Sequence, residues 1–274
     1  MGQTEDLHHV DLGDGPSIVL IHGLASNLHL WDGVARRLEE ARHRVVACDL
    51  RGHAQSPKPD EPYDVEAVAG DVIALIERLE LGACLLAGQS YGGTVALQVA
   101  AERPDLTAAV VCIDGGFLDL GRRYPEWERC RKELSPPNLT GRPLKALRLR
   151  MRAQQPGWPA EGLEAQLACF EVRDDGTVAP WLSLEHHLDV LHGFWEIDAP
   201  ALWARVAAPV LLVAAERPGS PAKAPWHDDA KRCQAILAEH TRAELVWMAG
   251  DHDLHAQHPE QVARVIERWG QGQL

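Results

Sequence analysis

The sequence predicts an α/β fold in which a mostly parallel sheet is flanked by helices. Along most of the 274 residues, apolar runs rich in β-branched side chains alternate with segments of helical periodicity. Such alternation is typical of βαβ units, and a chain of this length can form one core with a modest insertion. The alternation breaks between residues 117 and 200. We therefore expect a core of residues 1–116 and 201–274 and an inserted helical lid (cap) of residues 117–200.

Each expected element of the core follows from its local pattern. Six apolar runs have the length and composition of buried strands, and they cover residues 17–23, 44–50, 83–90, 108–116, 210–216 and 244–250. Five segments have helical patterning, at residues 31–42, 65–80, 91–102, 230–240 and 259–270. Residues 7–21 are typical of a hairpin whose two strands are joined by the turn Gly13-Asp14-Gly15.

The expected lid is rich in aromatic residues and prolines. Its aromatic side chains either line a substrate pocket or attach the lid to the core, since both uses are common. We expect Trp181 of the lid and Trp31 of the core to contact the substrate.

Charge and composition exclude some classes of function. The net charge of −13 argues against nucleic-acid binding, which needs clustered Lys and Arg. The N-terminus has no basic start followed by an apolar run, and no apolar stretch is long enough to span a bilayer. Cys48, Cys84 and Cys112 lie in strand-like runs, where they are typical of small core residues. We expect a cytoplasmic protein with no membrane or nucleic-acid partner, although a protein whose leader had been removed would have the same sequence.

A candidate nucleophile lies between a strand-like run and a helical segment. Gly88-Gln89-Ser90-Tyr91-Gly92 is a GxSxG motif in the strand, turn and helix context of a nucleophile elbow. Its glycines allow the backbone to crowd together and project the Ser90 hydroxyl. The alternative is an ordinary glycine-rich turn, but the flanking elements favour the elbow.

Together with this motif, two further segments resemble the α/β-hydrolase superfamily. Ile21-His22-Gly23-Leu24, followed by Trp31, resembles its oxyanion loop, and Asp49-Leu50-Arg51-Gly52-His53 resembles the end of its next strand. The resemblance covers nearly the whole chain apart from the lid. It implies that the backbone N–H groups of Leu24 and Tyr91 form the oxyanion hole.

Ser90 needs a general base, and fourteen histidines are available. His252 stands where the superfamily places its histidine, after the last predicted strand and before a helix beginning near Pro259. His255 and His258 follow it, so a metal site made of these three histidines is an alternative, but the spacing matches no established ligand signature. We expect no metal and no cofactor.

The third catalytic residue has two candidates. Most members of the superfamily carry an aspartate after the strand at residues 210–216, but Pro218 occupies that position here. Asp114 follows the strand after the nucleophile, as in a subset that includes some haloalkane dehalogenases and lactone hydrolases. We favour Asp114 over Glu216 as the partner of His252. The alternative for Asp114 is a turn residue before Gly115-Gly116.

These residues predict a serine hydrolase that cleaves a carboxylic ester or lactone of a hydrophobic small molecule through an acyl-enzyme. Carbon–carbon bond hydrolysis, thioester hydrolysis and acyl transfer would use the same triad. A noncatalytic ligand receptor of the same fold is a further alternative. Dehalogenase and epoxide hydrolase relatives have an aspartate at the position of Ser90, which disfavours those activities.

Overall fold

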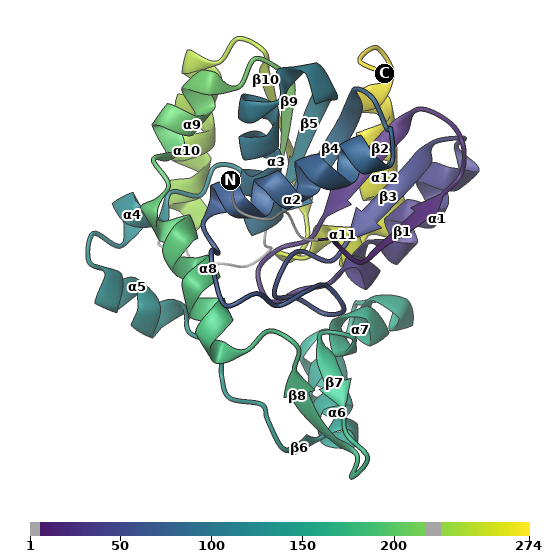
Figure 1. Ribbon diagram of the computed structural model, residues 1–274, viewed down its shortest axis with the longest axis vertical. Coiled ribbons are helices and arrows are strands. Elements are labelled where there is room, and N and C mark those ends of the chain that lie inside the picture. The colour runs from purple at the N-terminus through teal and green to yellow at the C-terminus, as the bar shows by residue number, and fades with distance from the viewer. Residues whose placement is uncertain (1–5, 217–225) are drawn as a thin grey trace.

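The computed structural model describes residues 6–216 and 226–274, and its centre is a seven-stranded sheet (Figure 1). The strand order is β1-β3-β2-β4-β5-β9-β10, and every pairing is parallel except that of β1 with β3. The strands are β1 (His9–Leu12), β2 (Ser17–Ile21), β3 (Arg44–Cys48), β4 (Cys84–Gln89), β5 (Thr107–Ile113), β9 (Val210–Glu216) and β10 (Ala243–Ala249). The mostly parallel sheet predicted from the sequence is therefore confirmed.

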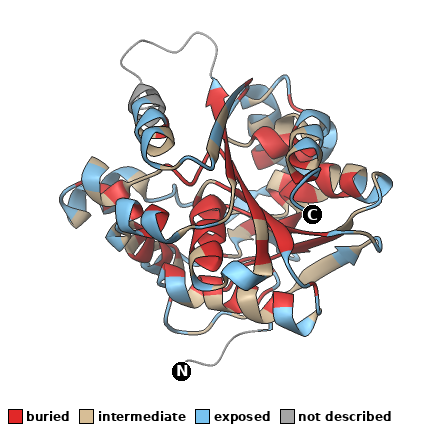
Figure 2. Cartoon of the chain, turned by 90° about the horizontal axis from the view of Figure 1, so that it is seen from above, coloured by how far each residue is buried: buried red, intermediate tan, exposed pale blue. Residues whose placement is uncertain are grey.

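Helices cover both faces of the sheet because successive strand residues point to opposite sides. Ile18 and Leu20 pack with α1 (Asp32–Glu40) and α12 (Pro259–Gly270) on one face. Val19 and Ile21 pack on the other face with α2 (Val65–Arg78) and α3 (Tyr91–Glu102). The central strands are buried on both faces (Figure 2), which explains why they read as continuous apolar runs.

Local chemistry sets where these helices begin. The Asp64 carboxylate accepts a hydrogen bond of 2.7 Å from the Ala67 N–H and caps α2. Pro259 occupies the first turn of α12, where its missing N–H costs nothing. Another helix of the core, α10 (Trp226–Glu239), precedes β10.

The predicted N-terminal hairpin is wrong. Strand β1 pairs with β3, and β2 lies on the other side of β3. The Gly13–Gly15 turn instead crosses the start of β3, where a Cβ at Gly15 would lie 1.7 Å from the Arg42 oxygen. The two backbones pack so closely that glycine is required here. The turn takes the chain across β3 and does not join two strands that pair with each other.

The lid segment, residues 117–200, lies between β5 and β9 in the sequence. It contains α4 (Leu120–Arg123), α5 (Trp127–Leu134), α6 (Leu144–Gln154), α7 (Ala160–Leu167) and α8 (Leu184–Glu196). A further helix, α9 (Ala199–Arg205), begins at its end and continues into the segment before β9. It also contains a small antiparallel sheet that the sequence did not predict, of order β6-β8-β7. These strands are β6 (Arg142–Pro143), β7 (Phe170–Val172) and β8 (Thr177–Pro180), and they lie away from the central sheet (Figure 1).

The six cysteines are thiols and form no disulfides with one another. Five are buried, and the sixth, Cys169, is half-buried and accepts a hydrogen bond from the Asn27 amide at 2.9 Å. Burial raises the pKa of the Cys84 and Cys169 thiols to about 12. Separately, none of the helices within residues 6–216 and 226–274 has the length and apolar character needed to cross a bilayer.

Candidate active site

Ser90 lies at the sharp turn between β4 and α3, in a conformation that ordinary residues avoid. Its φ is 52° and its ψ is −119°. A Cβ at Gly88 would lie 2.1 Å from the Gly92 oxygen, so the turn tolerates no side chain there. The Ser90 N–H donates to the Ile113 oxygen at 2.9 Å. These contacts hold the hydroxyl out from the end of the sheet, as a nucleophile elbow requires.

Asp114 follows β5 directly and is bonded to His252. Its Oδ2 atom accepts a hydrogen bond of 2.6 Å from His252 Nδ1, and its Oδ1 atom accepts one of 3.0 Å from the Ala215 N–H. The carboxylate is thus fixed by the neighbouring strand β9. Glu216, the other candidate, is exposed at the end of β9. Pro218 lies outside the described residues.

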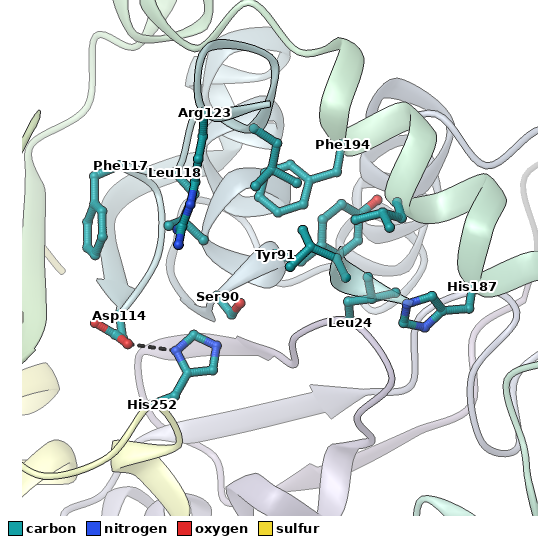
Figure 3. A pocket seen from close by; sticks show the side chains of 13 residues that line it. Leu24, Ser90, Tyr91, Asp114, Phe117, Leu118, Arg123, His187, Phe194 and His252 are labelled. Atoms are coloured by element: carbon teal, nitrogen blue, oxygen red, sulfur yellow. Dashed lines mark hydrogen bonds and ion pairs between the residues drawn. The ribbon is translucent and has the colours of Figure 1, made fainter. Parts of the chain in front are cut away.

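His252 lies in the loop between β10 and α11 (Leu254–Gln257). The Gln89 amide donates to the His252 backbone oxygen at 3.2 Å and connects this loop to the residue before Ser90. Figure 3 shows the His252 ring with one nitrogen bonded to Asp114 and the other on the side of Ser90. With Nδ1 donating to the carboxylate, Nε2 is the nitrogen available to accept a proton.

Leu24 and Tyr91 lie beside Ser90 in the same pocket (Figure 3). Neither backbone N–H donates a hydrogen bond to another residue of the described structure. Tyr91 is also the first residue of α3, where the helix dipole is positive. Both groups are therefore available to bind negative charge near the Ser90 hydroxyl.

Two buried histidines hold the loop that carries Leu24. The Leu50 N–H donates to His22 Nε2 at 2.9 Å, so His22 Nδ1 carries its proton and bonds the Gly23 oxygen at 2.7 Å. His53 Nε2 accepts from the Ala25 N–H at 3.2 Å. Burial lowers the pKa of His22 to about 4 and that of His53 to about 3, so both rings are neutral acceptors near neutral pH.

The pocket above Ser90 has a volume of about 500 Å³ and is mostly apolar. Besides the five residues predicted to take part in the reaction, its lining comprises Phe117, Leu118, Leu120, Arg123, Leu134, His187, Leu191 and Phe194. All eight belong to residues 117–200, so this segment supplies the roof of the pocket. Burial lowers the pKa of His187, which keeps its ring neutral.

Neither tryptophan predicted to contact the substrate lines this pocket. Trp31 is wholly buried in the core, with its ring 4.4 Å from that of His255, so the expectation for Trp31 is corrected. Trp181 lines a different cavity, of about 410 Å³, and the Lys58 ammonium lies 5.6 Å from the centre of its ring. The two cavities share His187 in their linings. Aromatic character alone did not distinguish packing from ligand contact.

The three clustered histidines do not converge. His252 faces the pocket, whereas the His255 ring is fully buried against Trp31 and His258 precedes α12. Across residues 6–216 and 226–274, no group of three or more His, Cys, Asp or Glu side chains has an arrangement that could hold a metal ion.

The roles of His22 and His53 and the position of Arg123 in the pocket were not predicted from the sequence. His22 lies in the segment that resembles the oxyanion loop, and His53 is the last residue of the segment at the end of the next strand. Their positions after two neighbouring strands could have indicated that both rings lie near the site. The sequence does not distinguish Arg123 from its neighbour Arg122, which has the same side chain but is exposed to solvent.

A family model described as the alpha/beta hydrolase fold matches residues 16–253. The chain belongs to the α/β-hydrolase family. The crystal structure of E-2-(acetamidomethylene)succinate hydrolase has a similar fold, with a TM-score of 0.78 and 25% identity over 96% of this chain and 94% of that one. This α/β-hydrolase also resembles 2-(acetamidomethylene)succinate hydrolase of Mesorhizobium japonicum, with 29% identity over 74% of this chain and 72% of that enzyme.

Other similarities are partial or concern the fold alone. An uncharacterized protein of Mycobacterium tuberculosis is 39% identical over 104 residues, which are 38% of this α/β-hydrolase and 30% of that protein. The match thus spans less than a third of the relative. A solved N-acyl homoserine lactone degrading enzyme has the same fold, with a TM-score of 0.71 and 20% identity over 98% of both chains.

Proposed function

We propose that this α/β-hydrolase is a serine hydrolase that cleaves a carboxylic ester or lactone of a hydrophobic small molecule. Ser90 is the nucleophile, His252 the general base and Asp114 the residue that orients it. The observation that carries the proposal is the 2.6 Å hydrogen bond between His252 Nδ1 and Asp114, in a pocket that Ser90 also lines. A histidine oriented in this way beside a serine at an elbow is the arrangement that nucleophilic acyl transfer needs.

The reaction begins when His252 Nε2 takes the proton of the Ser90 hydroxyl as its oxygen attacks the substrate carbonyl carbon. The imidazolium that forms is stabilised by the Asp114 carboxylate. It then gives its proton to the leaving alcohol, and an acyl-enzyme remains on Ser90. Water activated by His252 attacks this acyl group and releases the acid.

The tetrahedral oxyanion is stabilised by the backbone N–H groups of Leu24 and Tyr91. Their lack of other hydrogen bonds within the described structure supports this role. Because His22 and His53 hold the Leu24 loop in place, the donors need no rearrangement as the charge develops.

The apolar lining supports a hydrophobic substrate, since burial of apolar surface favours such a ligand. The name of the Mesorhizobium japonicum relative gives 2-(acetamidomethylene)succinate as what it hydrolyses. The substrate panel for this protein therefore contains acyl esters, lactones, thioesters and that compound.

The test is turnover of this panel by the wild-type protein and by Ser90→Ala, together with covalent labelling by a fluorophosphonate. We expect labelling of the wild type alone, and loss of activity in Ser90→Ala by about 10³-fold or more. Ser135→Ala, at an exposed serine after α5, is the matched control and keeps full activity. Thermal unfolding of each variant establishes that it is folded.

Two results would overturn the proposal. Turnover that persists in folded Ser90→Ala would exclude Ser90 as the nucleophile. Tight binding of panel compounds without labelling or turnover would instead favour a ligand receptor of the same fold.

A further inference from the structure

Arg123 places a positive charge in a pocket whose roof otherwise consists of apolar side chains and His187. It ends the short helix α4, and Figure 3 shows its side chain running down beside Phe117 and Leu118, with the guanidinium toward the Asp114–His252 pair. Of the described residues that line this pocket, it is the one Lys or Arg.

Local structure selects Arg123 rather than its neighbour for this position. The Asp119 carboxylate accepts a hydrogen bond of 2.9 Å from the Arg122 N–H and caps α4. The Arg123 N–H bonds the Asp119 oxygen at 3.1 Å. With the turn fixed in this way, Arg122 is exposed to solvent while Arg123 is half-buried and lines the pocket.

The carboxylates near Arg123 already have partners. Asp114 bonds His252 and the backbone of β9, and Glu133 forms an ion pair of 2.9 Å with Arg129. Within the described part of the chain Arg123 makes no side-chain hydrogen bond and no ion pair within 4.0 Å, although its charge contributes slightly to the lowered pKa of the Glu133 carboxyl. Its Cζ lies 5.5 Å from the centre of the Tyr124 ring. A guanidinium stays charged at all relevant pH, and a charge among apolar groups is costly unless it is paired.

We propose that the substrate carries a carboxylate, which pairs with Arg123 while its reactive carbonyl lies at Ser90. This inference rests on the proposed function, and it narrows the substrate class to acidic esters or lactones. The planar guanidinium matches a carboxylate with two parallel hydrogen bonds. One cation neutralises one negative charge, whereas a phosphate monoester would leave excess negative charge among leucine and phenylalanine side chains and near Asp114.

Arg123 therefore determines specificity without taking part in the chemical step. Arg123 would stabilise the bound acidic substrate through charge-assisted hydrogen bonds to its carboxylate. Loss of these bonds lowers kcat/KM for an acidic substrate by about 10- to 100-fold. A neutral substrate of the same shape gains nothing from Arg123, so its kcat/KM changes little.

The test compares two pairs of substrates that differ in one charge. The 4-nitrophenyl monoester of adipic acid and 4-nitrophenyl 6-methylheptanoate differ on the acyl side. 4-Acetoxybenzoate and 4-isopropylphenyl acetate differ on the alcohol side. Each is assayed with wild type, Arg123→Gln, Arg123→Lys and, as the matched control, Arg122→Gln, with Ser90→Ala giving the background rate.

We expect the wild type to prefer the acidic member of at least one pair, Arg123→Gln to lose that preference, and Arg123→Lys to retain part of it. Arg122→Gln behaves like wild type. Equal losses for both members of each pair, or the absence of any acidic preference in the wild type, would overturn the proposal. So would inhibition by inorganic phosphate without inhibition by adipate or benzoate, which would assign Arg123 to a phosphate group.

Failure of this inference is distinguishable from failure of the proposed function. If the wild type hydrolyses the neutral esters and is labelled at Ser90 but shows no charge preference, only the role of Arg123 is wrong. If Ser90→Ala retains turnover, the serine mechanism itself is wrong.

Discussion

Removal of the buried His255 imidazole should reduce the loss of stability in acid. The His255 ring is fully buried against Trp31, and neither ring nitrogen has a hydrogen-bond partner among the described residues. Burial, with smaller contributions from His252 and His22, lowers its pKa from 6.5 to about 3. Between these two values the unfolded chain binds a proton that the folded protein does not bind, so stability falls as the pH falls through this window.

The size of the effect follows from the two pKa values. Between about pH 7.5 and about pH 5, protonation of this one histidine in the unfolded chain lowers the free energy of unfolding by about 2 kcal/mol. His255→Phe removes this contribution and keeps a ring beside Trp31. The variant should therefore lose about 2 kcal/mol less than the wild type over that pH interval.

Urea unfolding at the two pH values, followed by tryptophan fluorescence, measures this difference. Leu254→Met, at the adjacent buried residue, is the control, because it changes packing without changing proton uptake and so shifts stability equally at both pH values. If His255→Phe and the wild type lose the same stability between the two pH values, then the His255 ring is protonated in the folded protein and the reasoning is refuted.

Two further predictions concern carboxylates. Asp114→Asn should lower kcat by about 10³- to 10⁴-fold, because an amide cannot stabilise the imidazolium. Glu216→Gln should stay within about 3-fold of wild type in the same ester assay. A large loss of activity in Glu216→Gln alone would make Glu216, and not Asp114, the partner of His252. Asp71→Ala should lower the free energy of unfolding by about 3–5 kcal/mol, because it removes the carboxylate that Arg51 bonds at 2.6 Å and so takes away the negative charge of a buried ion pair. Urea denaturation measures this loss, and a value under about 1 kcal/mol would contradict it.

The order of strands and helices in the core was predictable because each buried strand reads as an apolar run of its own. The predicted helix at residues 91–102 coincides with α3, and that at residues 259–270 coincides with α12. The small sheet of the lid segment was not predictable in this way. Its strands have only two to four residues and leave most of their side chains partly or fully exposed, so no apolar run marks them.

The local sequence pattern also does not show which strands pair with each other. The N-terminal residues have the composition of a hairpin, but β1 gains its hydrogen bonds from β3, which the chain reaches only some thirty residues later. That pairing depends on tertiary packing of the turn against Arg42. The residue types near β1 therefore do not predict which strand it pairs with.

Within the candidate site, the structure brings together the predicted residues that stand at strand ends. Ser90, Asp114 and His252 each follow a strand of the parallel sheet, and the carboxyl ends of such strands meet at one edge. Trp31, Trp181 and Arg123 have no such constraint. Whether their side chains face a pocket depends on how η1 (Leu28–Trp31), the lid segment and the core pack together, which residue type alone does not determine.

The protected state of the six native thiols makes this protein suitable for site-specific spectroscopy. Five are buried, and the sixth is bonded to Asn27 with its pKa raised to about 12, so alkylating probes should react slowly with the folded wild type. A cysteine introduced at Leu149, which is 70% exposed on α6, would then carry the label almost alone. A fluorophore there would report whether the surroundings of α6 change when an inhibitor occupies the pocket.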